Sequence, residues 1–432
     1  MNIIYLHTHD SGRYLQPYGA GVSTPNLAEF AKHGTLFRHC CSAAPTCSPS
    51  RAALLTGTWP HVNGVMGLTH RGFALHEPKM HLSHYLRVQG YETALFGVQH
   101  EARDAATLGY EHICIGDPLQ ADCDAQNVRA AAAFLKAPHE RNFFLSVGLH
   151  ATHRKYPKPP ESIRQEYLAP PAGLYDTQAV REDMAGYHAS AAIADECIGK
   201  LLDAVNEAGL AENTLILYTT DHGIAFPNMK CSLYDSGIGV ALMLAYPGNP
   251  TAGTATDSLV SQIDIFPTIC ELCGLPIPEW VSGKSLCPVL RGEGDVNAEV
   301  FAESTYHAAY EPMRCVRGER YKLIRRYDWH NRPVPANTDS SESKNFLREA
   351  GFYERVRPHE MLFDLYLDPM ERENLAQDAQ CQAVYGELSA KLDAWMSRTN
   401  DPLLQVNHRV PAPPGAKINR LESAEPSDMD YE

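Results

Sequence analysis

Cys47 occupies a position where a cysteine could do chemistry. It begins the segment Cys-Ser-Pro-Ser-Arg at residues 47–51, and Leu-Thr-Gly follows at residues 55–57. The segment has the pattern of a helix N-terminus, with Arg51 one turn beyond the cysteine. The helix dipole and an arginine both stabilise an anion, so we predict a reactive side chain at Cys47. The alternative is a buried cysteine that only packs.

Two acid–histidine pairs each follow a strand-like apolar run. His9 and Asp10 come after the first run, and Asp221 and His222 come after a later one. Ligands of open α/β sheets gather at the carboxyl ends of the strands, so we expect both pairs to lie near Cys47. A carboxylate and an imidazole from each loop would make a four-ligand site for one divalent cation. Taken singly, each of these residues could simply be a solvated loop residue.

The elements that must position these residues alternate between strand and helix. Strands are expected at residues 3–7, 92–96, 142–147, 214–220 and 240–245. Helices are expected at residues 24–34, 48–55, 81–88 and 181–208. This alternation is typical of a large, mostly parallel sheet with helices on both faces, which is an α/β fold.

The pattern changes near residue 297. Short strands at 300–302, 314–317, 321–326 and 361–365, with a helix near 383–396, indicate a smaller α+β subdomain with an antiparallel sheet. Residues 331–349 are polar and are expected to form a loop.

We therefore divide the chain into a catalytic domain at 1–296, a subdomain at 297–400 and a tail at 401–432. The tail is rich in proline and charge. It is expected to be disordered or to reach onto a neighbouring subunit, which would make the protein a homo-oligomer.

Composition excludes several classes of protein. The 432 residues carry a net charge of −15, which argues against a nucleic-acid partner. No apolar run is long enough to cross a membrane, and the first residues form a strand rather than an export signal. The twelve cysteines lack the spacing of a disulfide framework. We expect a reduced, cytoplasmic globular protein.

Taken together, the motifs resemble those of the type I sulfatases, which belong to the alkaline-phosphatase-like superfamily. Residues 47–51 match the family's signature, in which the cysteine is converted after translation to formylglycine. Residues 2–12 resemble its opening segment, with His9 in place of the first of two aspartates, and residues 218–223 resemble its second metal segment. Residues 362–376 resemble a stretch near its C-terminus. The resemblance covers residues 2–395 and is strongest to the heparan N-sulfatase (sulfamidase) branch.

The resemblance implies further site residues. His100 matches the histidine of a Gly-Lys-x-His motif whose lysine is replaced here by Val98. His153 matches a second active-site histidine, and Lys230 matches a sulfate-binding lysine. The residues expected to be catalytic are Cys47, Arg51, His100, His153 and Lys230. His70 and Arg71, with Lys230, are expected to bind substrate, and the metal ligands are expected to be His9, Asp10, Cys47, Asp221 and His222.

The resemblance also implies the chemistry. The family uses one divalent cation, usually calcium and sometimes magnesium, but two imidazoles would favour manganese or zinc. A formylglycine-generating enzyme is an expected partner. The hydrate of formylglycine would attack sulfur, with Arg51, Lys230 and the cation holding the charge on the sulfuryl oxygens. His153 or His100 would protonate the leaving group.

The expected activity is hydrolysis of a sulfuric ester or sulfamate on a small anionic, sugar-like substrate. One alternative is a phosphonate monoester or phosphodiester hydrolase of the same superfamily, which shares the formylglycine motif and an Asp-His pair. Val98 and His9 support that alternative. A second alternative is a non-catalytic anion-binding protein, which would be expected to have lost the nucleophile or the ligands, yet both are present here.

Overall fold

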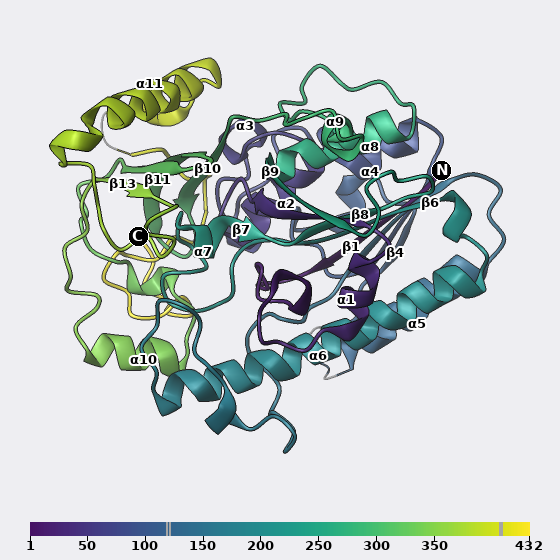
Figure 1. Ribbon diagram of the computed structural model, residues 1–432, viewed down its shortest axis with the longest axis horizontal. Helices are drawn as coiled ribbons and strands as arrows, with labels where there is room; N and C mark the ends of the chain where they lie inside the picture. Colours follow the sequence, from purple (N-terminus) through teal and green to yellow (C-terminus); the bar gives the residue numbers. More distant parts are fainter. Residues whose placement is uncertain (118–119, 121, 406–408) are drawn as a thin grey trace.

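The computed structural model describes residues 1–117, 120, 122–405 and 409–432. A nine-stranded sheet and a separate four-stranded sheet make up its framework (Figure 1). The large sheet has the order β4-β3-β5-β1-β6-β8-β2-β7, with β9 also paired to β2. These strands are β1 (Asn2–Thr8), β2 (Thr35–Cys41), β3 (Glu92–Gly97), β4 (His112–Cys114), β5 (Phe143–Gly148), β6 (Thr214–Thr220), β7 (Gly239–Val240), β8 (Leu242–Ala245) and β9 (Thr254–Ser261).

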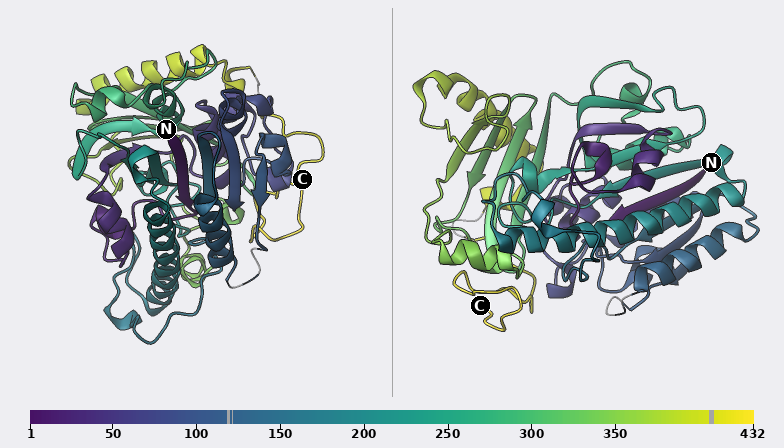
Figure 2. Two further views of the ribbon diagram at one scale, coloured as in Figure 1. Left: turned by 90° about the vertical axis from the view of Figure 1, so that its right-hand side faces the viewer. Right: turned by 60° about the horizontal axis from the view of Figure 1, so that its bottom comes forward.

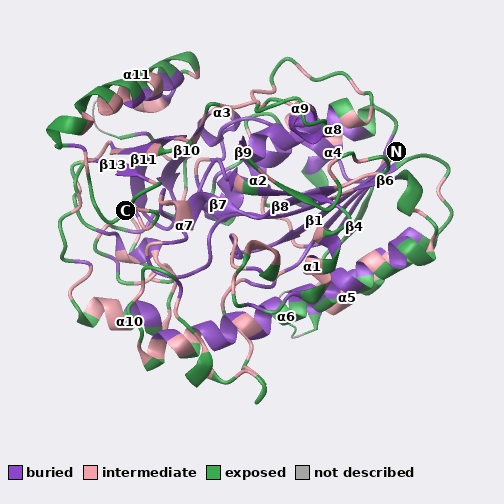
Figure 3. Ribbon diagram, in the orientation of Figure 1, coloured by how far each residue is buried: buried purple, intermediate pink, exposed green. Residues whose placement is uncertain are grey.

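Helices cover both faces of this sheet, which confirms the predicted α/β class (Figure 3). Ile4 and Leu6 of β1 pack with residues of α1 (Pro25–Ala31), α5 (Cys123–Lys136) and α6 (Gln178–Glu207). Ile3 and Tyr5, on the opposite face, share a core with α2 (Cys47–Thr56), α4 (Leu82–Val88), α8 (Ile265–Leu272) and α9 (Cys287–Leu290). Every residue of β1 is therefore buried, as expected for a central strand between two helical layers.

Five of the main-sheet strands differ from the prediction. The run at 240–245 forms two short strands, β7 and β8, which run antiparallel to their neighbours β2 and β6. The strands β2, β4 and β9 were not predicted at all. β9 begins with exposed polar residues, so its sequence lacks the apolar run of a buried strand.

The second sheet has the order β10-β11-β12-β13 and is antiparallel throughout, as predicted. Its strands are β10 (Glu299–Tyr306), β11 (Tyr310–Gly318), β12 (Tyr321–Arg326) and β13 (Glu360–Asp364). The helix α11 (Gln382–Arg398) packs on it through Trp395. Two further single-turn helices, α3 (Pro60–Asn63) and α7 (Asp235–Ile238), lie in loops between larger elements.

The predicted loop at 331–349 is wrong in part, because it contains the helix α10 (Glu342–Glu349). Ser341 caps the helix by accepting a hydrogen bond from the backbone N–H of Lys344 at 3.1 Å. Glu342 lies in the first turn, where a negative charge is favoured. The polar composition of this segment predicted a loop, but the segment forms a short, capped helix.

The tail also differs from its prediction. We call residues 409–432 the C-terminal strap, and they lie along their own chain rather than forming a disordered end (Figure 2, yellow). Val410 and Ile418 are buried against Phe73, Tyr306 and Tyr310. Few apolar side chains are needed, because backbone and ionic contacts hold most of the strap.

All twelve cysteines are free thiols. Among the described residues, no helix combines the length and the apolar character that a membrane crossing requires.

Candidate active site

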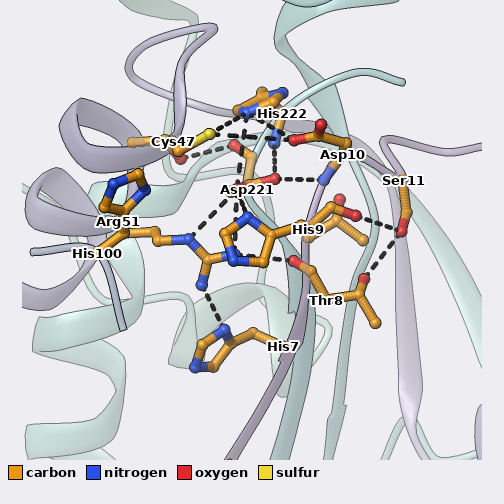
Figure 4. A network of polar contacts seen from close by, with 12 residues as sticks. His7, Thr8, His9, Asp10, Ser11, Cys47, Arg51, His100, Asp221 and His222 are labelled. Atoms are coloured by element: carbon orange, nitrogen blue, oxygen red, sulfur yellow. Dashed lines mark hydrogen bonds and ion pairs between the residues drawn. The ribbon is translucent and has the colours of Figure 1, made fainter. Parts of the chain in front are cut away.

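The two acid–histidine pairs meet at the carboxyl end of the central strands. β1 and β6 are parallel neighbours with Thr8 opposite Thr220, so the residues that follow each strand lie side by side. The backbone N–H of Asp10 donates a hydrogen bond to Asp221 Oδ1 at 2.8 Å. The predicted convergence is therefore present in the structure, and Cys47 joins it from α2 (Figure 4).

Local backbone geometry aims these side chains. Asp10 has a φ of 35°, in the left-handed region that few non-glycine residues adopt. Gly223 follows His222 where a Cβ would lie 1.9 Å from the carbonyl oxygen of Ser236, so only glycine fits. The turn after β6 can thus carry the pair Asp221-His222 inward while the chain passes close to its neighbour.

Cys47 is the first residue of α2 and is 2 % exposed. Its Sγ lies 3.3 Å from His222 Nε2 and 4.0 Å from Asp10 Oδ1. Burial raises the pKa of the Cys47 thiol, and although Lys230 lowers it, Asp10 raises it further. The unmodified cysteine is therefore a neutral thiol, which differs from the anion that the helix N-terminus suggested.

Arg51 stabilises a thiolate at Cys47 only weakly, because its guanidinium pairs with Asp221 instead. Its Nε and Nη2 donate to Asp221 Oδ2 at 3.2 and 3.0 Å, and Nη2 also donates to the Thr8 carbonyl at 3.1 Å. Nη1 contacts His7 Nδ1. Arg51 is 1 % exposed, so it fixes the Asp221 carboxylate and the end of β1 rather than facing a substrate.

The donors around Cys47 fit a divalent cation. His222 Nδ1 lies 2.9 Å from the Gly223 carbonyl and donates to it, which leaves Nε2 with a lone pair. That nitrogen lies 3.2 Å from Asp10 Oδ1 and 3.6 Å from Asp221 Oδ2. Electron-rich atoms facing one another are stable only with a positive charge among them.

His9 completes the group. Its Nδ1 lies 3.3 Å from Asp221 Oδ2, and neither ring nitrogen has a hydrogen-bond partner among the described residues although His9 is 2 % exposed. Donor atoms of His9, Asp10, Cys47 and Asp221 all lie within 4.8 Å of one another. With His222 at its edge, this group has the mixed nitrogen and oxygen character that suits manganese or zinc.

Lys230 supplies the buried cation on the other side of Asp10. Its Nζ lies 3.0 Å from Asp10 Oδ2 and 2.9 Å from Asp339 Oδ2. Asn228 and Cys231 on either side have φ values of 62° and 65°, which turn the chain tightly around the lysine. Opposing the cost of burial, Asp10 and Asp339 hold the pKa of Lys230 well above its usual value.

Further histidines surround the open side of the group. The ring of His9 lies 6.4 Å from that of His100, 6.1 Å from that of His150 and 5.5 Å from that of His153. His70 stacks on His100, with Nδ1 2.9 Å from Nε2. Burial lowers the pKa of His100 well below its usual range, and His70 and Arg51 lower it further.

Arg71 lies away from the site, contrary to its predicted role in substrate binding. Its guanidinium donates to Asn419 Oδ1 at 2.7 Å, to the Lys417 carbonyl at 3.0 Å and to the Pro426 carbonyl. All three partners belong to the C-terminal strap. Arg71 therefore holds the strap, while its neighbour His70 remains exposed at the rim.

Sequence reasoning missed three residues at this site. His150 lies in the same short segment as His153, and the run Leu-His-Ala-Thr-His could have identified both. Asp339 and His307 carry no such signal. Asp339 comes from the segment before α10, and His307, which is 6 % exposed, comes from the turn between β10 and β11. Only tertiary structure brings these two near Lys230.

Comparisons with known proteins agree with this geometry. The sulfatase family model matches residues 2–275, and a model described as the C-terminal part of N-sulphoglucosamine sulphohydrolase matches residues 226–352. The N-sulphoglucosamine sulphohydrolase of Homo sapiens is 27% identical over 93% of this chain and 91% of its own length. An ulvan-active sulfatase of Formosa agariphila is also 27% identical, over 93% of this chain and 75% of its own.

Solved structures share the fold. A putative sulfatase from Bacteroides thetaiotaomicron superposes with a TM-score of 0.75 at 22% identity, covering 98% of this chain and 99% of that one. A protein solved with its substrate D-glucosamine-2-N,6-O-disulfate gives a TM-score of 0.73 at 19% identity, covering 94% and 99%. With its fold, its converged site and the family model in agreement, the chain belongs to the sulfatase family, which has an alkaline-phosphatase-like fold and whose members are hydrolases acting on sulfuric esters.

Proposed function

We propose that this sulfatase cleaves a sulfuric ester or sulfamate on a small sulfated sugar, using a formylglycine made from Cys47 and one divalent cation. The observation that carries the proposal is the position of Cys47 Sγ. It lies 3.3 Å from His222 Nε2, beside the side chains that could hold a cation. Lys230 Nζ contacts the Asp10 carboxylate, which lies between the lysine and Cys47. The nucleophile, the candidate cation ligands and the Lys230 ammonium therefore lie together in one buried site.

The modification gives Cys47 a chemistry that the thiol lacks. The hydrate of a formylglycine carries two hydroxyls on one carbon. One oxygen attacks sulfur, and the bond from sulfur to the leaving atom breaks. The second hydroxyl then loses its proton, the C=O bond reforms and sulfate leaves. The formylglycine-generating enzyme is therefore a required partner in this proposal.

The cation would be held by His9, Asp10, Asp221 and His222, next to the modified Cys47. When bound, it supplies Lewis-acid stabilisation of negative charge on the attacking oxygen. Arg51 contributes indirectly, because its two hydrogen bonds keep Asp221 ionised and oriented. Burial alone would raise the pKa of Asp221, but the charge of the Arg51 guanidinium helps to hold it well below its usual range.

The remaining side chains divide the work on the substrate. Lys230 and Cys47 both contact the Asp10 carboxylate, so the Lys230 ammonium would hold the sulfuryl oxygens. His153 is the better candidate for the acid that protonates the leaving atom, since its Nδ1 contacts the Arg154 carbonyl and leaves Nε2 for the substrate. His100 is less suited, because its Nε2 is engaged by His70.

The substrate class has support from the relatives. Those most similar include an N-sulphoglucosamine sulphohydrolase and ulvan-active sulfatases, and one neighbour in fold was solved with a sulfated glucosamine. A sulfated sugar or amino sugar is therefore the substrate class to test first.

Mass spectrometry tests the nucleophile. The tryptic peptide at residues 39–51 should be lighter by about 18 Da when Cys47 has been converted, because an aldehyde replaces the thiol-bearing carbon. Cys47→Ala should abolish turnover while leaving the melting temperature close to that of the wild type. Full activity from a protein whose Cys47 is an unmodified thiol would overturn the proposal.

A phosphonate monoester or phosphodiester hydrolase is the second candidate, and one observation favours it. Val98 replaces the lysine that sulfatases use to hold sulfate, so the anion pocket has one cation fewer. Comparing kcat/KM for an aryl sulfate, a sulfamate and an aryl phosphonate on the same preparation separates the candidates. A phosphonate preferred over both sulfur substrates would make this the function.

A further inference from the structure

Asp339 lies beside Lys230, although no motif marks it. It stands in the segment between β12 and α10, and its Oδ2 lies 2.9 Å from Lys230 Nζ. Its side chain is 17% exposed, whereas that of Lys230 is 4% exposed. Lys230 engages Oδ2, and among the described residues no group donates a hydrogen bond to Oδ1. Asp339 thus presents a carboxylate on the more exposed side of the pair.

The position of Lys230 defines what Asp339 can face. Its Nζ bridges Asp10 on the cation side and Asp339 on the open side. A sulfuryl group bound at Lys230 and Cys47 would therefore have Asp339 beside it. Two anions repel at such a distance, so a second carboxylate weakens binding unless it accepts a hydrogen bond from the substrate.

We propose that Asp339 accepts this hydrogen bond from the bridging N–H of a sulfamate, and so selects N-sulfated over O-sulfated substrates. The inference rests on the proposed sulfate-releasing function and assigns its specificity. A sulfamate has a hydrogen on the atom that joins sulfur to the sugar. A sulfate ester has an oxygen there, whose lone pairs would face the carboxylate without a proton between them.

Cleavage strengthens the same preference. The S–N bond breaks with its electron pair on nitrogen, which takes a proton from His153 and leaves as an amine that becomes an ammonium at neutral pH. A carboxylate nearby stabilises that developing positive charge. An alcohol leaving from a sulfate ester is neutral and gains nothing comparable.

Asp339 is ionised in the folded protein, as this role requires. Burial opposes ionisation, but Lys230, His153 and His307 together hold the pKa of Asp339 well below its usual range. Two of these neighbours are the groups that would hold the sulfuryl oxygens and protonate the leaving atom. Asp339 therefore lies near the atoms at which the bond breaks.

The C-terminal strap keeps Asp339 in place. Lys344 Nζ donates to the Thr338 carbonyl at 2.9 Å and pairs with Glu425 at 2.8 Å. The hydroxyl of Ser340 also contacts Glu425. The residues on both sides of Asp339 are thus tied to the strap, which fixes the carboxylate that they flank.

A matched pair of probes tests the inference. Cyclohexyl sulfamate and cyclohexyl sulfate differ only in the bridging atom, and calorimetry in a Cys47→Ala background measures binding without turnover. We expect the sulfamate to bind about tenfold more tightly, and Asp339→Asn to remove most of that difference. Asp257→Asn is the matched control, because the side chain of Asp257 is 81% exposed and the change should leave the ratio unchanged.

Two outcomes would overturn the inference. Asp339→Asn could weaken both probes equally, which would make it only a support for Lys230, or it could change neither. Turnover of the same probes by the modified enzyme gives an independent result. No hydrolysis of either probe, with the binding ratio intact, would contradict the proposed function and leave the specificity assignment standing. Hydrolysis of both probes, with no effect of Asp339→Asn on the ratio, would support the proposed function and contradict the specificity assignment.

Discussion

His9 gives the cation site its character. It stands where the sulfatase pattern has an aspartate, and its Nδ1 lies 3.3 Å from Asp221 Oδ2. With His222 it places two imidazoles beside two carboxylates. Nitrogen donors favour borderline metals such as manganese and zinc, whereas calcium selects six to eight oxygens. One residue therefore changes which ion the site should prefer.

Replacing this imidazole should change the metal preference. We expect His9→Asp to increase the stabilisation by calcium and reduce that by manganese or zinc, because a carboxylate replaces a nitrogen donor. Melting temperature against added metal measures both, and metal content after dialysis gives a second readout. His150→Asn, a nearby histidine outside the ligand group, is the control. An unchanged order of metals in His9→Asp would mean that His9 is no ligand.

At this scale the sequence predicted much of the site. Cys47, Asp10, Asp221 and His222 converge as expected because parallel strands place their carboxyl ends together. Arg71 was misassigned, since its guanidinium binds the strap. A local motif carries no information about partners more than three hundred residues away in the chain.

The helix α4 shows how one element depends on pH. His81 caps its N-terminus, and its Nδ1 accepts a hydrogen bond from the Ser83 N–H at 3.3 Å. Burial, with a smaller effect of His84, lowers the pKa of His81 to about 3. The folded state thus binds the proton less readily than the unfolded chain, whose histidine has a pKa near 6.5.

This cap should make the fold sensitive to acid. The neutral His81 contributes fully to the free energy of unfolding above about pH 6.5, the pKa in the unfolded chain. As the pH falls below that value the contribution is lost, by about 2 kcal/mol at pH 5. His81→Asn keeps a capping acceptor that does not titrate, so it should flatten this dependence. Urea unfolding at several pH values measures the change, with the exposed His33→Asn as control. Equal slopes in His81→Asn and the wild type would contradict the assignment.

Two of the elements that the sequence missed share a physical cause. β9 starts with an exposed, largely polar stretch and α10 has few apolar residues, so neither contains the apolar run of a core element. Both owe their conformation to partners, β9 to its pairing with β2 and α10 to its contacts with α6.

The whole molecule has a core that joins its two sheets. Trp395 of α11 is fully buried, stacked on Phe301 of β10 at 5.0 Å and edge-on to Trp59 at 5.6 Å. The same cluster includes Ile263 from the part before residue 297 and Val316 from the part after it. The predicted boundary at 296 thus runs through a shared core rather than a linker.

We therefore expect one cooperative unfolding transition for the whole chain. Trp395→Ala should reduce the free energy of unfolding by about 3–5 kcal/mol, because it leaves a large cavity between the sheets. Calorimetry measures the transition, and Trp329→Ala is the control, since Trp329 is 79% exposed. Two separate transitions in the wild type would mean that the sheets unfold independently.

The position of the C-terminal strap in the chain determines when its contacts can form during synthesis. Synthesis runs from the amino end, so residues 409–432 leave the ribosome after every group that they fasten, including Arg71 and Lys344. A nascent chain that still lacks them already contains Cys47 and the residues around it, while the segment carrying Asp339 lacks its contacts with Glu425. If Asp339 selects the substrate as proposed, this selectivity is the property of a newly made molecule that waits for the strap to dock.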